Sequence, residues 1–153
     1  MDYFKLKAEL TADPEDIGYT ELTDQQAADA LNVVNRVQVY SRFLSLRALA
    51  AVMSDVEYGT LKAFLSQASA ASPRVADMAA MLAMPCSDAG DTGGLDFGAA
   101  EVRAMVDAFG ALDGMADAAA RVKALAERRV SRAEELGLGM MLPGYIASAR
   151  EMT

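Results

Sequence analysis

Residues 113–137 read DGMADAAARVKALAERRVSRAEELG and form the longest segment of the chain with a consistent apolar stripe. The members of the stripe are Val122, Leu125, Ala126, Val130 and Ala133. At about 100° per residue, this spacing places them on one side of a helix. Gly137 follows the last turn, at the position where glycine commonly closes a helix. The pattern predicts one long helix from Asp113 to Leu136, leading into the C-terminal turn.

The same segment carries the densest group of basic residues in the chain. Arg121, Arg128 and Arg132 fall on the side of the predicted helix opposite the apolar stripe. Such a face is typical of a solvated amphipathic helix whose acidic neighbours moderate its charge. It also suits an interface, where arginine is the preferred charged residue. In an acidic protein, this second interpretation predicts charge-complementary self-association through the basic face.

Local start signals predict further helices on both sides of this segment. Asp2 can cap a first helix through Leu10, Thr23 and Gln26 form a capping box, and Ser72 precedes a proline at a first helical position. Apolar spacing predicts the others near 46–53, 54–65, 99–109 and 143–150. We therefore expect an all-α fold: a single compact bundle of about seven or eight helices forming one helical domain over residues 1–153.

Residues 37–43, VQVYSRF, alternate apolar and polar side chains between two helical patterns. Alternation is typical of a strand, but the sequence offers this segment no evident partner strand. It is predicted to be an extended connector or a continuation of the preceding helix. If it is extended, Val39, Tyr40 and Phe43 belong to an unpaired edge to which a neighbouring subunit could add a strand.

Residues 85–94 are glycine-rich and acidic and predict a flexible loop. Asp88 and Asp91 resemble calcium ligands superficially, but the alternating oxygen ligands closed by a bidentate glutamate are missing. We expect no metal there and treat both aspartates as candidate contacts of an exposed loop.

A second candidate contact lies near the C-terminus, where Met140 and Met141 follow a glycine-punctuated turn. This apolar pair either folds back onto the core beside Tyr145 and Ile146 or offers a methionine-rich surface to a partner.

Composition narrows the function classes. The net charge is −8, with 22 acidic and 14 basic residues, so direct binding to nucleic acid or to a membrane surface is not expected. The chain has no histidine and one cysteine, Cys86, which removes the usual catalytic bases and nucleophile pairs. We expect no enzymatic activity, no catalytic residue and no cofactor. The start lacks the features of a signal peptide, and we expect synthesis in a reducing cytoplasm.

Two stretches resemble a family of small tailed-bacteriophage proteins. The first is LKAELTADP at residues 6–14, followed by Gly18-Tyr19 and by LTDQQAADALN at residues 22–32. The second is VSRAEELGLG at residues 130–139, followed by a short helix that contains Ala149-Arg150. Members of this family are mostly of unassigned function and are encoded among virion structural genes. The two stretches bracket nearly the whole chain.

The resemblance implies a structural protein of the virion rather than a chemistry. We expect self-association and contacts with portal, connector, tail or capsid subunits, in the head-to-tail connector (neck) region rather than as a capsid decoration protein. That preference follows from the frequency of helical folds in connector rings. The alternative is a protein outside the virion, either a phage assembly chaperone or an acidic inhibitor of a host protein.

Overall fold

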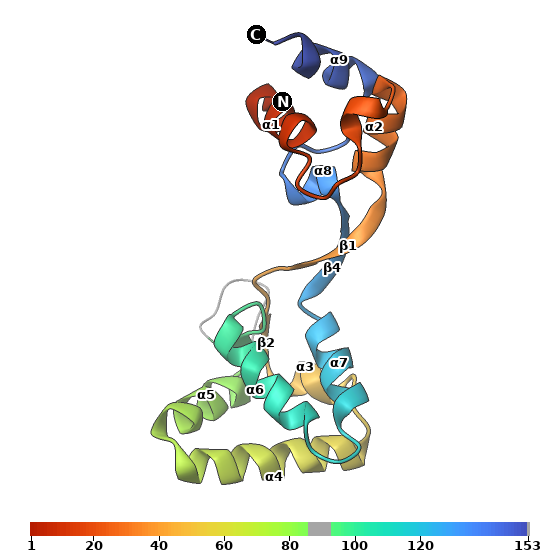
Figure 1. Cartoon of the computed structure of the whole chain (residues 1–153). Helices are drawn as coiled ribbons and strands as arrows, with labels where there is room; N and C mark the ends of the chain where they lie inside the picture. The colour runs from red at the N-terminus through yellow and green to blue at the C-terminus, as the bar shows by residue number, and fades with distance from the viewer. Residues whose placement is uncertain (86–92, 153) are drawn as a thin grey trace. The chain divides into compact units, whose positions relative to one another are not determined.

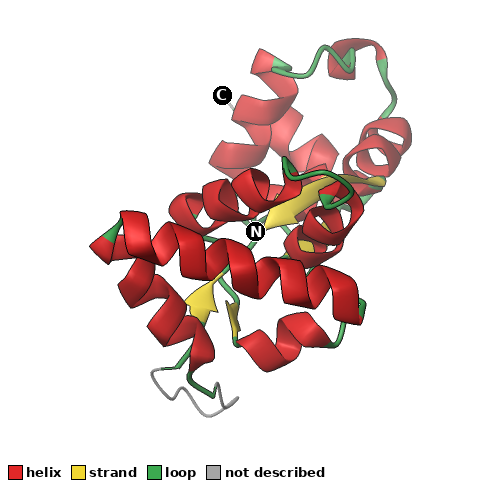
Figure 2. Ribbon diagram, turned by 90° about the horizontal axis from the view of Figure 1, so that it is seen from below, coloured by secondary structure: helices red, strands yellow, loops and turns green. Residues whose placement is uncertain are grey.

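The computed structural model describes residues 1–85 and 93–152. Helices dominate this part of the chain (Figure 2). They are α1 (Tyr3–Ala12), the short 3-10 helix η1 (Tyr19–Glu21), α2 (Asp24–Asn32), α3 (Leu46–Ala50), α4 (Asp55–Ala71), α5 (Pro73–Ala83), α6 (Ala100–Gly110), α7 (Ala116–Ala124), α8 (Arg132–Glu135) and α9 (Pro143–Glu151). The strands are β1 (Val34–Val39), β2 (Phe43–Leu44), β3 (Leu95–Asp96) and β4 (Glu127–Ser131). The predominantly helical class is confirmed, but the strands mean that the fold is not strictly all-α.

The chain forms two compact units rather than one uniform bundle. Unit 1 contains Met1–Gln38 and Arg129–Thr153, and unit 2 contains Val39–Arg128. Each unit buries its own apolar core. The predicted single helical domain therefore contains two packing units, and each is described by itself.

In unit 1, α9 packs against α1 and α2, and α2 also contacts α8 (Figure 1). The core between these helices includes Leu6, Leu31 and Ile146, all fully buried. The caps predicted from sequence are present here: Asp2 accepts from the backbone of Lys5, and Thr23 forms its capping box.

Unit 2 is built from two helix pairs, α4 with α5 and α6 with α7 (Figure 1). Phe97 and Phe109 are the largest fully buried side chains of its core. Strands β2 and β3 pair antiparallel, with Leu44 opposite Leu95. Ser72 caps α5 ahead of its proline, as predicted.

The predicted long helix from Asp113 to Leu136 is wrong. Helix α7 ends at Ala124, residues 127–131 form β4, and α8 begins at Arg132. Ser131 and Glu134 form a reciprocal capping box that starts α8. Four of the five residues of the apolar stripe are buried and Leu125 is partly buried, but Val122 and Val130 reach their cores from a helix and from a strand.

Residues 34–39 adopt the extended form that the sequence left open, and the expectation that this segment has no partner in the chain is wrong. Strand β1 pairs with β4 (Figure 1). The partner was hidden because ERRVS at residues 127–131 continues a helical apolar pattern. Pairing with β1 outweighs that local preference.

Candidate interface residues

The basic face predicted for one helix does not exist. Arg121 lies in α7, Arg128 in β4, and Arg132 is the first residue of α8. The three guanidinium groups stand on different elements, and two of them are engaged by glutamates of their own unit.

Arg132 forms a buried ion pair with Glu9. Its Nε and Nη2 atoms donate to the two carboxylate oxygens of Glu9 at 2.7 and 2.8 Å. Its Nη1 atom donates to Glu135 at 2.9 Å. The Glu9 and Arg132 side chains are only 5% and 14% exposed. Hydrogen bonds from Arg132 to Glu9 raise the arginine's pKa further, although burial opposes this. Arg132 therefore ties α8 to α1.

The charge cluster of unit 1 continues to Arg36, which pairs with Glu15 at 3.0 Å and with Glu135 at 3.4 Å. Tyr19 is fully buried, and its hydroxyl has no hydrogen-bond partner in the described part of the chain. Burial raises the pKa of Tyr19 to about 12, and the carboxylate of Glu9 adds to this effect.

Arg121 has a structural role in unit 2. Its Nη2 atom lies 2.8 Å from each carboxylate oxygen of Glu57, and its Nε atom donates to the Val52 carbonyl at 2.9 Å. Glu57 also accepts from the backbone N–H of Ser54 in the α4 capping box. That backbone hydrogen bond, followed by the one from Arg121, lowers the pKa of Glu57 to about 2. Arg121 thus connects α7 to the start of α4, while Arg128 is exposed on β4.

The three candidate contact residues of the predicted connector differ in how exposed they are. Val39, at the end of β1, and Phe43, in β2, are 40% and 58% exposed. Tyr40 is partly buried, and its hydroxyl donates to the Leu125 carbonyl at 3.3 Å. Val39 and Phe43 are available for contacts, whereas Tyr40 holds the local fold.

The two C-terminal methionines also differ in how exposed they are. Met141 is 1% exposed, whereas Met140 is 76% exposed. The Asn32 side chain fixes this arrangement: its amide nitrogen donates to the Met141 carbonyl and its amide oxygen accepts from the Met141 N–H, both at 2.8 Å. Met141 therefore folds back onto the core, whereas a partner contact at the exposed Met140 stays a prediction. The candidates Asp88 and Asp91 lie outside the described residues.

The structure adds exposed apolar residues that were not among the predicted contacts. Val33, Val34 and Val37 are 51%, 54% and 60% exposed. Val34 and Met140 line one open depression of about 250 Å³, together with Asn32, Ser131 and Glu134. The repeated β-branched valines of residues 33–39 were the available signal for an extended segment.

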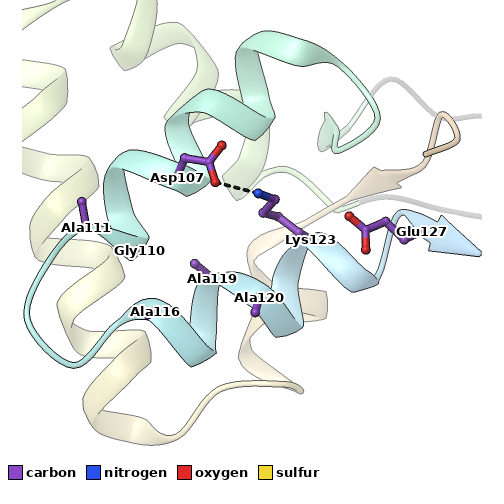
Figure 3. A pocket seen from close by; sticks show the side chains of 8 residues that line it. All are labelled: Asp107, Gly110, Ala111, Ala116, Ala119, Ala120, Lys123 and Glu127. Carbon is purple, nitrogen blue, oxygen red and sulfur yellow. Dashed lines mark hydrogen bonds and ion pairs between the residues drawn. The ribbon is translucent and has the colours of Figure 1, made fainter. Parts of the chain in front are cut away.

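A larger groove of about 460 Å³ runs between α6 and α7 (Figure 3). Its floor is made of small residues, and a Cβ added to Gly110 would lie 2.7 Å from the Cβ of Ala119. The charges at its rim are paired: Lys123 with Asp107 at 2.7 Å, and Glu127 with Arg103. This groove reflects close helix packing and has no converging polar groups to orient a ligand.

Within residues 1–85 and 93–152, no group of three or more histidine, cysteine or carboxylate side chains is arranged to hold a metal ion. No helix in the same ranges is long and apolar enough to cross a membrane. Comparison with family models, curated proteins and solved structures finds no match to this chain.

Proposed function

We propose that this protein is a structural component of a tailed-phage virion that works by binding copies of itself and neighbouring virion proteins. The observation that carries the proposal is the apolar surface of β1 and its surroundings in unit 1. Exposed valines at 33, 34 and 37 follow one another along the chain, and Met140 shares a depression with Val34. Exposed apolar side chains gathered in one segment are characteristic of protein contact surfaces.

This surface replaces the basic helix face as the site of assembly. Two of the three arginines expected to meet a partner are held by Glu57 and Glu9 within their own units. The partner contact is therefore apolar at its centre, and charge acts mainly at its margins. Depletion of charge at the centre of a contact is the usual composition of protein interfaces.

The placement in the particle rests on the family resemblance of residues 6–32 and 130–150 and on the helical class. The resemblance favours a virion component, and the helical class favours the head-to-tail connector over capsid decoration. In this position the neighbours are portal, connector or tail subunits.

Mass spectrometry of purified particles tests the proposal. Particles of the phage that encodes the chain are banded twice in a density gradient and compared with the soluble fraction of the same lysate. We expect the protein to co-purify with the particles at a constant ratio to the portal protein. Its presence in the lysate and absence from the particles would reject a virion role in favour of an assembly chaperone or a host-protein inhibitor.

A further inference from the structure

The backbone of β1 has one edge that faces β4 and one that does not. The N–H of Tyr40 donates to the carbonyl of Ala126, the residue before β4, at 3.0 Å. Backbone groups of an extended chain point to alternate sides, so Gln38 also faces β4. Val37 and Val39 then direct their backbone groups to the opposite edge, whereas the Asn35 N–H donates to the Val33 carbonyl at 3.1 Å. No third strand in the described part of the chain pairs with that edge.

One face of β1 lacks the features that protect natural strand edges. Asn35, Val37 and Val39 share this face and are uncharged, and Val37 is 60% exposed. Arg36, the charged residue of β1, lies on the other face. Edge strands in monomeric proteins usually carry lysine, proline or a bulge, which prevent another strand from pairing. An uncharged strand face rich in β-branched residues favours strand addition.

We propose that this edge pairs with the same edge of a second copy, antiparallel and about a two-fold axis at Val37. The resulting sheet has the order β4-β1-β1-β4. This inference rests on the self-association in the proposed function and specifies its geometry.

The side chains of β1 select the register. With the axis at Val37, the two copies of Val37 lie opposite each other, Asn35 lies opposite Val39, and Arg36 lies opposite Gln38. An axis at Arg36 would place two guanidinium groups opposite each other, which is unfavourable. An axis at Gln38 would pair only residues 37–39 within the strand. The Val37 register combines the longest overlap with no opposed like charges.

The charges of the chain are consistent with this choice of surface. Two copies with a net charge of −8 each repel one another, so contact is least opposed where the surface is uncharged. Arg36, the charged residue of β1, is paired with Glu15 and Glu135. Added salt screens the overall repulsion, so pairing through an apolar edge strengthens as ionic strength rises.

Disulfide formation between copies tests the register. The single cysteine is first removed by Cys86→Ala, and Val37→Cys or Val34→Cys is then introduced into the full chain. Opposed residues of a hydrogen-bonded antiparallel pair have Cα atoms about 5.5 Å apart, within the range of a disulfide. In the same sheet, the two copies of residue 34 are offset by about 20 Å along the strands. Because Val34 and Val37 are similarly exposed (54% and 60%), accessibility alone does not separate the two variants.

Under mild oxidation we expect Val37→Cys to form a dimer rapidly and Val34→Cys to remain largely uncrosslinked. Val37→Lys, which opposes two ammonium groups at the axis, should lose the dimer peak in size-exclusion chromatography. The matched control Val56→Lys should keep it, because Val56 is also exposed (74%) but lies in α4 rather than in β1. Circular dichroism checks that each variant is folded.

Equal crosslinking of both cysteine variants, or a dimer that persists in folded Val37→Lys, would overturn the β1 pairing. Either result would leave self-association through another surface intact. A wild-type chain that is monomeric at every concentration and salt would also overturn it. Absence from purified particles would reject the virion role without affecting strand pairing measured on the isolated protein.

Discussion

The guanidinium of Arg132 donates to both carboxylate oxygens of Glu9, at 2.7 and 2.8 Å, across 123 positions of sequence. This contact joins the first helix of unit 1 to the short helix α8, and both side chains are largely buried. A residue that the sequence suggested as a partner-binding arginine is instead part of the folded core. We therefore expect replacement of Arg132 to change the free energy of unfolding.

Replacement of Arg132 by methionine should destabilise the protein by about 3 kcal/mol, because Glu9 is left buried without its cation. Urea denaturation followed by circular dichroism measures the change. The control is Arg129→Met, since Arg129 is exposed on β4, and the expected change there is within about 0.5 kcal/mol. Combining Arg132→Met with Glu9→Gln should recover part of the loss. Equal effects of the two single arginine substitutions would refute a structural role for the ion pair.

Tyr19 makes stability depend on alkaline pH. Its pKa is about 12 in the folded protein and about 10 in the unfolded chain, so the unfolded chain releases this proton first. The difference between these two pKa values makes a contribution to the free energy of unfolding that is fully present below pH 10. This contribution is lost as the pH rises from about 10 to about 12. Tyr19→Phe should lack this decline.

At pH 7 the same substitution should leave stability unchanged or slightly raised, since it removes a buried hydroxyl without a partner in the described part of the chain. Thermal unfolding of both proteins at pH 7 and pH 11 provides the comparison. An identical alkaline loss in wild type and Tyr19→Phe would show that other groups cause it.

The adjacent methionines should respond differently to truncation. Met141→Ala removes a fully buried side chain and should cost about 2–5 kcal/mol. Met140→Ala changes an exposed side chain and should cost less than about 0.5 kcal/mol. Denaturant midpoints measure both values. If Met140→Ala proved the more damaging substitution, the register set by the two Asn32 hydrogen bonds would be incorrect.

Two glycines of unit 2 provide another matched pair. A Cβ at Gly98 would lie 2.5 Å from the backbone oxygen of Tyr40, so Gly98→Ala should destabilise the β2–β3 region. A Cβ at Gly59, within α4, meets nothing within 4 Å, and Gly59→Ala should raise stability by about 0.5–1 kcal/mol. Thermal unfolding distinguishes the two. A stable Gly98→Ala variant would contradict the close backbone approach.

Local signals in the sequence predicted the parts of the fold that depend on neighbouring residues. Thr23 and Gln26 lie three positions apart, and their capping box forms as expected. Arg132 could not be interpreted in this way, because its partner Glu9 is distant in sequence. Residues 127–131 continued a helical pattern and became a strand only because β1 is available to pair with them.

The exposure of the candidate interface residues also depends on contacts between residues that are far apart in sequence. Exposure of Met140 and burial of Met141 depend on Asn32, which is 109 positions away from Met141, so no local pattern separates the two methionines. The sequence suggested an unpaired edge within residues 37–43, whereas in the structure residues 34–39 pair with β4. The proposal that Val37 is the centre of strand pairing depends on this partner strand, which determines which backbone groups face outward.

Sedimentation equilibrium of the wild-type chain measures whether copies of the protein associate. The measurement covers micromolar to millimolar protein at low and high salt. We expect the average mass to rise from 16.2 kDa toward at least twice that value with concentration, and to rise earlier at high salt. A mass that stays at 16.2 kDa throughout would rule out self-association of the isolated protein.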